Sequence, residues 1–172
     1  MKKKTASMLA ILSALLVAAV TWLIVVQTPA AAQGRTTITL DVHFSGFFLL
    51  DFSANGVRQV TSFQDPFDPS KGDQIMFRDE LLRNGQVIGH DGGTCVVTEF
   101  AAAEADPIKL ACQVTFELPD GQIATQGIAT NNPVKPLAVT GGTGRYVGAS
   151  GDTVLTEFGD GTGSVVFHLA RR

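Results

Sequence analysis

Positive charge is scarce beyond the start of this sequence. The first 32 residues hold three of the thirteen Lys and Arg residues and none of the sixteen Asp and Glu residues. Residues 33–172 therefore carry ten positive and sixteen negative side chains, a net charge of −6. Because no basic stripe crosses them, a nucleic acid is excluded as the expected partner.

Motifs for metal binding and for covalent catalysis are also missing. Of the three histidines, His43 and His90 stand beside a strand and a turn, where we expect solvated side chains. His168 has no Cys or carboxylate at ligand spacing, so we predict no metal site. No Gly-x-Ser-x-Gly sequence or other nucleophile signature occurs, and we predict no cofactor.

The glycine-rich stretch TGGTGRYVGASG (140–151) lacks what a phosphate site requires. A P-loop needs a Lys and a Ser or Thr after its glycines, and then a helix. Here the strand-like DTVLTEF follows, so no helix N-terminus is available to bind an anion. We interpret the stretch as a tight turn between two strands, with Tyr146 covering its backbone.

The start of the chain is typical of an exported protein. Three lysines precede the apolar run MLAILSALLVAAVTWLIVV (8–26), and a small-residue A-x-A site ends at Ala32. This order predicts a secretory signal peptide at 1–32 and a single mature domain at 33–172. The run is also long enough for an uncleaved membrane anchor, which stays an alternative. Under both alternatives the domain lies outside the cytoplasm.

Cys95 and Cys112 are the two cysteines of the chain. In an exported protein an even pair is more often a disulfide than two thiols. We therefore predict a bond between Cys95 and Cys112 on neighbouring strands.

Alternation of apolar and polar residues dominates the domain, and no helical period is present. Ile38, Leu40, Val42 and Phe44 alternate with polar residues, as in a half-buried strand. Further strand-like runs are 46–52, 57–63, 73–82, 94–100, 109–118, 122–130, 152–158 and 163–170. Asn-Gly or Asp-Gly pairs, which are strong hairpin signals, stand at 55–56, 84–85, 120–121 and 160–161. The pattern predicts an all-β sandwich or closed barrel, and an eight-stranded barrel has room for one small ligand.

Three segments of the chain carry a family resemblance. They are GDQIMFRDELLRNGQVIGHDGGTCVV (72–97), FELPDGQIATQG (116–127) and LAVTGGTGRYVGASG (137–151). In this order they resemble the allene oxide cyclase and dirigent barrel superfamily over about residues 72–156. The resemblance implies an eight-stranded antiparallel β-barrel with an apolar pocket, which follows the hydrophobic leader helix.

The resemblance also implies substrate-binding residues. Ile75, Phe77 and Asp79 match pocket-lining positions, and by alternation they share one face of their strand. Cys95 matches a further pocket position, and Ala129 stands at the pocket position where the family has a tyrosine. Asp79 is the candidate catalytic residue, with a pKa raised by desolvation; the alternative is a hairpin residue that bonds the backbone. A Cys95 that is not in a disulfide would be a pocket thiol.

Known members of the superfamily hold a flexible, apolar, reactive molecule in one conformation. The resemblance implies a small-molecule cyclase or isomerase that promotes intramolecular ring closure, such as a [4+2] cycloaddition in polyketide biosynthesis. Allene oxide cyclase uses a Glu and an Asn that the strand ITLDVHF (38–44) lacks, so oxylipin cyclisation is not expected. The alternative function is a non-catalytic, exported, dirigent-like protein that binds an apolar ligand. An apolar small molecule is the expected partner, and a second copy of the chain and the membrane are further candidates.

Overall fold

The structure is a computed structural model that describes residues 35–52, 56–60 and 69–170. The predicted signal peptide or anchor at 1–32 lies outside the described residues, as do Asn55 and the first part of the 65–73 loop. None of the helices in the described ranges is long and apolar enough to cross a membrane.

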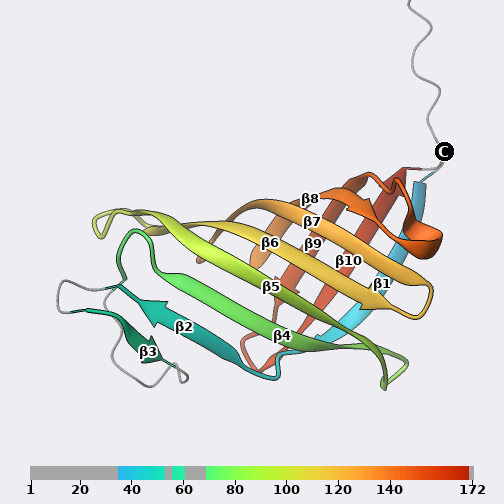
Figure 1. Cartoon of the computed structure of the whole chain (residues 1–172), viewed down its shortest axis with the longest axis horizontal. Coiled ribbons are helices and arrows are strands. Elements are labelled where there is room, and N and C mark those ends of the chain that lie inside the picture. The colour runs from blue at the N-terminus through green and yellow to red at the C-terminus, as the bar shows by residue number, and fades with distance from the viewer. Residues whose placement is uncertain (1–34, 53–55, 61–68, 171–172) are drawn as a thin grey trace, which may run out of the picture. The chain divides into compact units, whose positions relative to one another are not determined.

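The described part of the chain is all-β, as the alternation predicts (Figure 1). It contains the strands β1 (Arg35–His43), β2 (Phe47–Asp51), β3 (Arg58–Val60), β4 (Gln74–Arg83), β5 (Gln86–Phe100), β6 (Ile108–Leu118), β7 (Gly121–Thr130), β8 (Val134–Gly142), β9 (Gly151–Glu157) and β10 (Thr162–Ala170), and the 3-10 helix η1 (Gly144–Tyr146). The strand β5 starts eight residues before the predicted 94–100 run, because its hairpin with β4 begins directly at the Asn84-Gly85 turn.

Eight of these strands close into an antiparallel barrel, which confirms the predicted fold class. The order is β1-β10-β9-β8-β7-β6-β5-β4, and β1 pairs with β4 to complete the ring. Because the ring is closed, it has no free edge strand. Free edges are a common source of aggregation in open sheets. The short strands β2 and β3 extend the sheet from β4 outside the ring.

One edge of β4 has two successive partners. The stretch Glu80–Leu82 pairs with the end of β1, and Gln74–Phe77 pairs with β2. Between them the chain passes from β1 to β2 through residues 44–46, beside Arg78 and Asp79. Figure 1 shows β2 leaving the barrel wall along the lower edge of β4. This is the point at which the wall of the barrel changes partner.

Alternate residues of every strand face the barrel interior. Its centre is formed by side chains that are at most 1% exposed: Leu40, Val42, Leu81, Phe116, Ile123, Val165 and Phe167. The rings of Phe116 and Phe167 meet edge to face, with centroids 4.9 Å apart. Burial of this apolar surface is the main force that stabilises the fold, at about 25 cal/mol for each Å² removed from water.

The glycine-rich stretch is a compact strand connection, as predicted. It leaves β8, forms η1 and enters β9. Gly144 has a φ of +56°, and a Cβ on Gly142 would lie 2.6 Å from the carbonyl oxygen of Tyr146. Tyr146 is half-buried and packs against the core, which agrees with its expected role of covering this backbone.

Candidate functional site

The structure places the five predicted pocket residues inside the barrel. Ile75, Phe77 and Asp79 lie on the inner face of β4, where the two apolar residues pack against the core and Asp79 is 3% exposed. Cys95 lies opposite Ile75 on β5. Ala129 is buried on β7, opposite Leu110 of β6. Their assignment to substrate binding stays a prediction.

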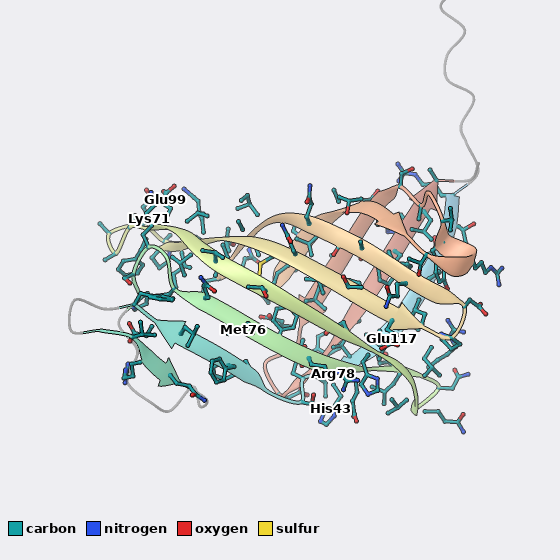
Figure 2. All side chains as sticks on the ribbon, in the orientation of Figure 1. His43, Lys71, Met76, Arg78, Glu99 and Glu117 are labelled. Carbon is teal, nitrogen blue, oxygen red and sulfur yellow. A yellow bond between two sulfur atoms is a disulfide. The ribbon has the colours of Figure 1, made fainter. Side chains whose placement is uncertain are left out.

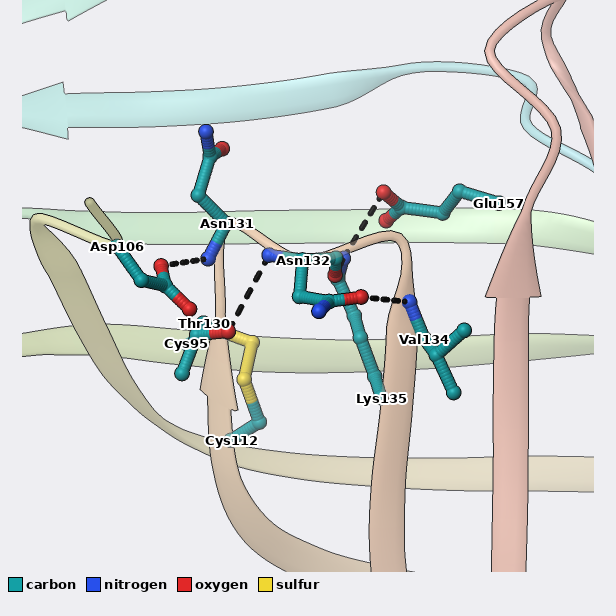
Figure 3. Close-up of polar contacts among 9 residues, drawn as sticks. All are labelled: Cys95, Asp106, Cys112, Thr130, Asn131, Asn132, Val134, Lys135 and Glu157. Carbon is teal, nitrogen blue, oxygen red and sulfur yellow. Dashed lines mark hydrogen bonds and ion pairs between the residues drawn. A yellow bond between two sulfur atoms is a disulfide. The ribbon is translucent and has the colours of Figure 1, made fainter.

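The predicted disulfide is present. Cys95 and Cys112 are directly opposite each other on β5 and β6, and their sulfur atoms are bonded at 2.00 Å (Figure 3). The described chain has no free cysteine. The alternative of a free pocket thiol at Cys95 is therefore wrong, because the fold brings the two Cα atoms within 4.1 Å.

A second buried carboxylate, which the sequence patterns did not indicate, faces Asp79. Asp91 of β5 is directly opposite Asp79 of β4 and is 4% exposed. Side chains opposite each other on antiparallel strands have Cβ atoms only about 4.5–5.5 Å apart. The backbone N–H of Asp79 donates to Oδ1 of Asp91 at 3.3 Å. The two residues form one site, which we call the aspartate pair.

A β-bulge produces this juxtaposition. Next to the Asn84-Gly85 turn, Leu82 pairs with Val87, but Leu81 pairs with Gly89, so β5 contains one extra residue. Without that residue, continued pairing would place His90 opposite Asp79 and turn Asp91 to the outer face, because successive residues alternate between faces. The bulge therefore decides that a carboxylate, and not an imidazole, enters the barrel.

Gly89 allows the bulge to pack against β6. A Cβ built on Gly89 would lie 2.0 Å from the carbonyl oxygen of Glu117, a distance that no real Cβ contact has. Gly92, three residues later, has its nearest atom at 3.7 Å and tolerates a Cβ. Gly89 is thus a local requirement of the bulge, but the residue by itself does not give the register that places Asp91 opposite Asp79.

Hydrogen bonds hold Asp79 at the place where β4 changes partner. The backbone N–H of Ser45 donates to Oδ1 of Asp79 at 3.0 Å, and the Ser45 hydroxyl donates to the carbonyl oxygen of Arg78 at 2.6 Å. Phe44 continues this connection, and its N–H donates to the carbonyl oxygen of Gly161 at 3.0 Å. Asp79 therefore ties the β1–β2 connection to the barrel wall while facing the interior.

Burial raises the pKa of both aspartates. The pKa of Asp79 is raised mainly by desolvation. The hydrogen bond from Ser45 and the nearby His43 lower this pKa, and the charge of Glu157 raises it. The pKa of Asp91 is raised to about 7 by desolvation and then by the charge of Asp79. A carboxyl group with a pKa near 7 exists in both protonation states at neutral pH, as a general acid or base requires.

Apolar and charged groups surround the pair on different sides. Phe116 lies opposite Asp91 on β6, and Phe77 precedes Asp79 by two residues on the same face of β4. Glu157, at the end of β9, is paired with Lys135 at 2.9 Å (Figure 3). His43 is exposed and pairs with Glu80 at 3.1 Å on the outside. Figure 2 shows His43, Arg78 and Glu117 at the same end of the barrel, far from Lys71 and Glu99.

The outer wall has a separate polar depression of about 460 Å³. It is lined by Gly92, Gly93, Thr94, Gln113, Val114, Thr115, Ala124, Thr125, Gln126 and Thr140. Neither aspartate lines it, and it contains no titratable side chain. The chemistry that the aspartate pair can perform therefore belongs to the interior. In the part of the chain that the structure describes, no group of three or more metal-binding side chains occurs.

Solved structures share this fold. Pyocyanin demethylase superposes with a TM-score of 0.65 at 25% identity, over 78% of this chain and all of that one. The Diels–Alderase AbmU from Streptomyces koyangensis superposes with a TM-score of 0.56 at 15% identity, over 83% of this chain and 72% of that one. A pterocarpan synthase dirigent protein superposes with a TM-score of 0.53 at 17% identity, over 79% of this chain and 88% of that one. No curated protein sequence matches the chain.

The sequence of the chain also matches a family model, which is more specific than a shared fold. The profile of the allene oxide cyclase barrel-like domain matches residues 56–164, which is more than half of the chain. The matched range contains the hairpin that carries both aspartates, the disulfide and the glycine-rich connection. This protein belongs to the allene oxide cyclase barrel-like family.

Proposed function

We propose that the protein is a small-molecule cyclase or isomerase that holds an apolar substrate in its barrel. The observation that carries this proposal is the aspartate pair, two carboxylates buried opposite each other within an apolar interior. Burying two carboxylates together is costly, and groups with strongly raised pKa values concentrate at functional sites. Asp79 is the catalytic candidate that the sequence indicates. Asp91, which lies opposite it, is a second catalytic candidate.

The pair suits a reaction in which a proton is donated at one atom and removed at another. Asp91, with its pKa near 7, donates a proton to a heteroatom of the substrate, and Asp79 accepts one when its carboxyl group is in the ionised form. General acid–base catalysis of this kind contributes about 10²–10⁴-fold to a rate. The apolar walls, among them Ile75 and Phe77, exclude water and hold the substrate near its reactive conformation, which lowers the barrier further.

Ring closure is the reaction class that we favour, and a [4+2] cycloaddition is its most specific form. A cycloaddition transfers no proton, so in that reaction the pair would act by hydrogen-bonding to a polar group of the substrate and orienting it. The fold shared with the Diels–Alderase AbmU supports this choice. The alternative is a non-catalytic protein that binds and orients an apolar ligand, which the fold shared with a dirigent protein supports. The aspartate pair favours the enzyme, because a passive apolar carrier gains nothing from two buried carboxylates.

A second candidate reaction is the conversion of a phenazine. Pyocyanin demethylase has the highest identity of the three solved structures described above, and this chain covers all of its length. Pyocyanin is therefore included among the test compounds. We also propose an extracytoplasmic location, which the predicted signal peptide and the Cys95–Cys112 disulfide support.

Turnover by the oxidised, full-length protein tests the proposal. The protein is incubated with polyene substrates able to close a ring and with pyocyanin, and the products are separated by chiral chromatography. We expect faster or more stereoselective conversion of one compound, and loss of that effect in Asp79→Asn and Asp91→Asn. Glu117→Gln, which removes one charge from the exposed face of β6, is the matched control. Unchanged rates and stereochemistry with every compound that binds would favour the non-catalytic alternative.

A further inference from the structure

The aspartate pair has no protein cation to neutralise it. Among the ion pairs of the described residues, none includes Asp79 or Asp91. Near this end of the barrel Lys135 pairs with Glu157 and His43 with Glu80, and Arg78 is exposed on the outer face of β4. A buried carboxylate is normally paired, protonated or bound to a cation from outside the chain.

Each carboxylate also retains an oxygen that no described protein group contacts by a hydrogen bond. Asp79 accepts the Ser45 N–H through Oδ1, and Asp91 accepts the Asp79 N–H through Oδ1. The structure shows no donor to either Oδ2 atom within the described ranges. Neither atom is among the buried side-chain atoms that lack a partner there, so both retain some contact with solvent. Two acceptor oxygens, which carry negative charge when the pair is ionised, are therefore available on the inner face of β4 and β5.

Two aromatic residues neighbour the aspartate pair in the sheet. Phe116 is the direct neighbour of Asp91 on β6, and Phe77 shares the inner face of β4 with Asp79. The faces of aromatic rings attract cations, and the attraction grows when water is excluded. Carboxylates and phenyl rings together favour a flat, apolar molecule that carries one positive charge over a neutral molecule of the same shape.

We propose that the aspartate pair is a recognition site for an aromatic cation, that is, a ring system containing an alkylated or protonated nitrogen. The proposal rests on the proposed function, since it names the substrate class for the same interior site. The charge of the ligand takes the place of the proton that the pair otherwise holds. Binding therefore exchanges a proton for a cation at Asp91.

The exchange makes affinity depend on pH. The charged groups near the pair are Asp79 and Asp91 themselves, His43 at the end of β1 and Glu157 at the end of β9; Phe116 of β6 adds no charge. With a pKa of about 7 for Asp91 in the free protein, a ligand that requires its ionised form binds about tenfold more tightly at pH 8 than at pH 6.

The test uses two compounds of the same shape, the permanent cation N-methylquinolinium and neutral 1-methylnaphthalene. Their affinities for the oxidised, full-length protein are measured by calorimetry at pH 6 and pH 8. We expect the cation to bind at least about tenfold more tightly than the neutral compound at pH 8, and to lose about tenfold in affinity at pH 6. Asp91→Asn should weaken cation binding and remove its pH dependence, while Glu117→Gln should change neither.

Equal affinity for the two compounds, binding of the cation that is independent of pH, or no binding of the cation at millimolar concentration would each overturn the proposal. If Asp91→Asn does not fold, the proposal is still tested by the pH dependence of cation affinity in the wild-type protein and by the cation affinity of Asp79→Asn. Turnover of neutral polyenes without cation preference would overturn this inference and leave the proposed function standing. Recognition of the cation without turnover of any compound would support this inference and contradict the proposed function.

Discussion

Asp79 of β4 and Asp91 of β5 lie directly opposite each other inside the barrel, and the N–H of Asp79 donates to Oδ1 of Asp91 at 3.3 Å. The carboxyl group of Asp79 accepts the N–H of Ser45, at the point where β4 changes its partner from β1 to β2. One residue thus connects the chemistry of the interior with the closure of the barrel wall. Both roles can be separated by experiment.

Replacing Asp79 by Asn should lower activity much more than stability. The amide oxygen can still accept the Ser45 N–H, so the unfolding free energy should change by less than about 1 kcal/mol. Turnover or cation affinity should fall at least tenfold, because the variant removes a negative charge from a medium of low dielectric constant. Denaturant unfolding and an activity assay check this; a loss of several kcal/mol with unchanged activity per folded molecule would make Asp79 a structural residue.

Asp91 should make the protein less stable as the pH rises. Its pKa is about 7 in the folded state and 3.8 in the unfolded chain, so the folded state binds the extra proton between these values. The stabilisation is complete below about pH 4 and is lost as the pH rises through about 7, on the order of 4 kcal/mol in all. The free energy of unfolding is measured with urea at pH 5 and pH 8. Relative to the wild type, that of Asp91→Asn should increase as the pH rises. A constant difference between the two proteins would show that Asp91 ionises normally.

Gly89→Ala should disrupt the bulge. Its Cβ would meet the carbonyl oxygen of Glu117 at 2.0 Å, so β5 or β6 must move, at a cost of about 2 kcal/mol or more. Gly92→Ala is the matched control, since its nearest atom is 3.7 Å away and we expect a change below about 1 kcal/mol. Thermal or urea unfolding of both variants compares them. Equal stabilities would show that the bulge does not depend on glycine.

Breaking the disulfide should destabilise the barrel without changing its strand order. The bond closes a loop between residues 17 apart, which corresponds to about 3 kcal/mol in the chain-entropy description. Unfolding of Cys95→Ala/Cys112→Ala, compared with the oxidised wild type, measures this. Mass spectrometry without reductant should also find one linked peptide pair; two alkylatable thiols in the native exported protein would contradict the assignment.

The leader gives a prediction that spectroscopy can check. Cleavage after Ala32 removes Trp22, the single tryptophan of the chain, and leaves Tyr146 as the strongest near-ultraviolet chromophore of the domain. Intact mass and tryptophan emission of protein from its native host should therefore show a shorter chain without tryptophan. A membrane-bound product that keeps its tryptophan would establish the anchor instead.

Local patterns in the sequence determined most of the strands, several hairpins and the interior face of β4, but β8 was not among the strand-like runs. Alternation is a local property, so it suffices to assign Ile75, Phe77 and Asp79 to one face of their strand. The Asn84-Gly85 turn likewise predicted a hairpin, because its backbone conformation suits a two-residue connection. The disulfide followed from two cysteines and a predicted export signal.

The tertiary structure decided which residue meets Asp79. Pairing counted outward from the Asn84-Gly85 turn places His90 there, and a single extra residue beside Gly89 replaces it with Asp91. That bulge is set by the close approach of β6 to Gly89, a contact with Glu117 that lies 28 positions later in the chain. The pairing of β1 with β4, which brings Ser45 to Asp79, is likewise long-range. Register and closure depend on such distant contacts, and no local pattern encodes them.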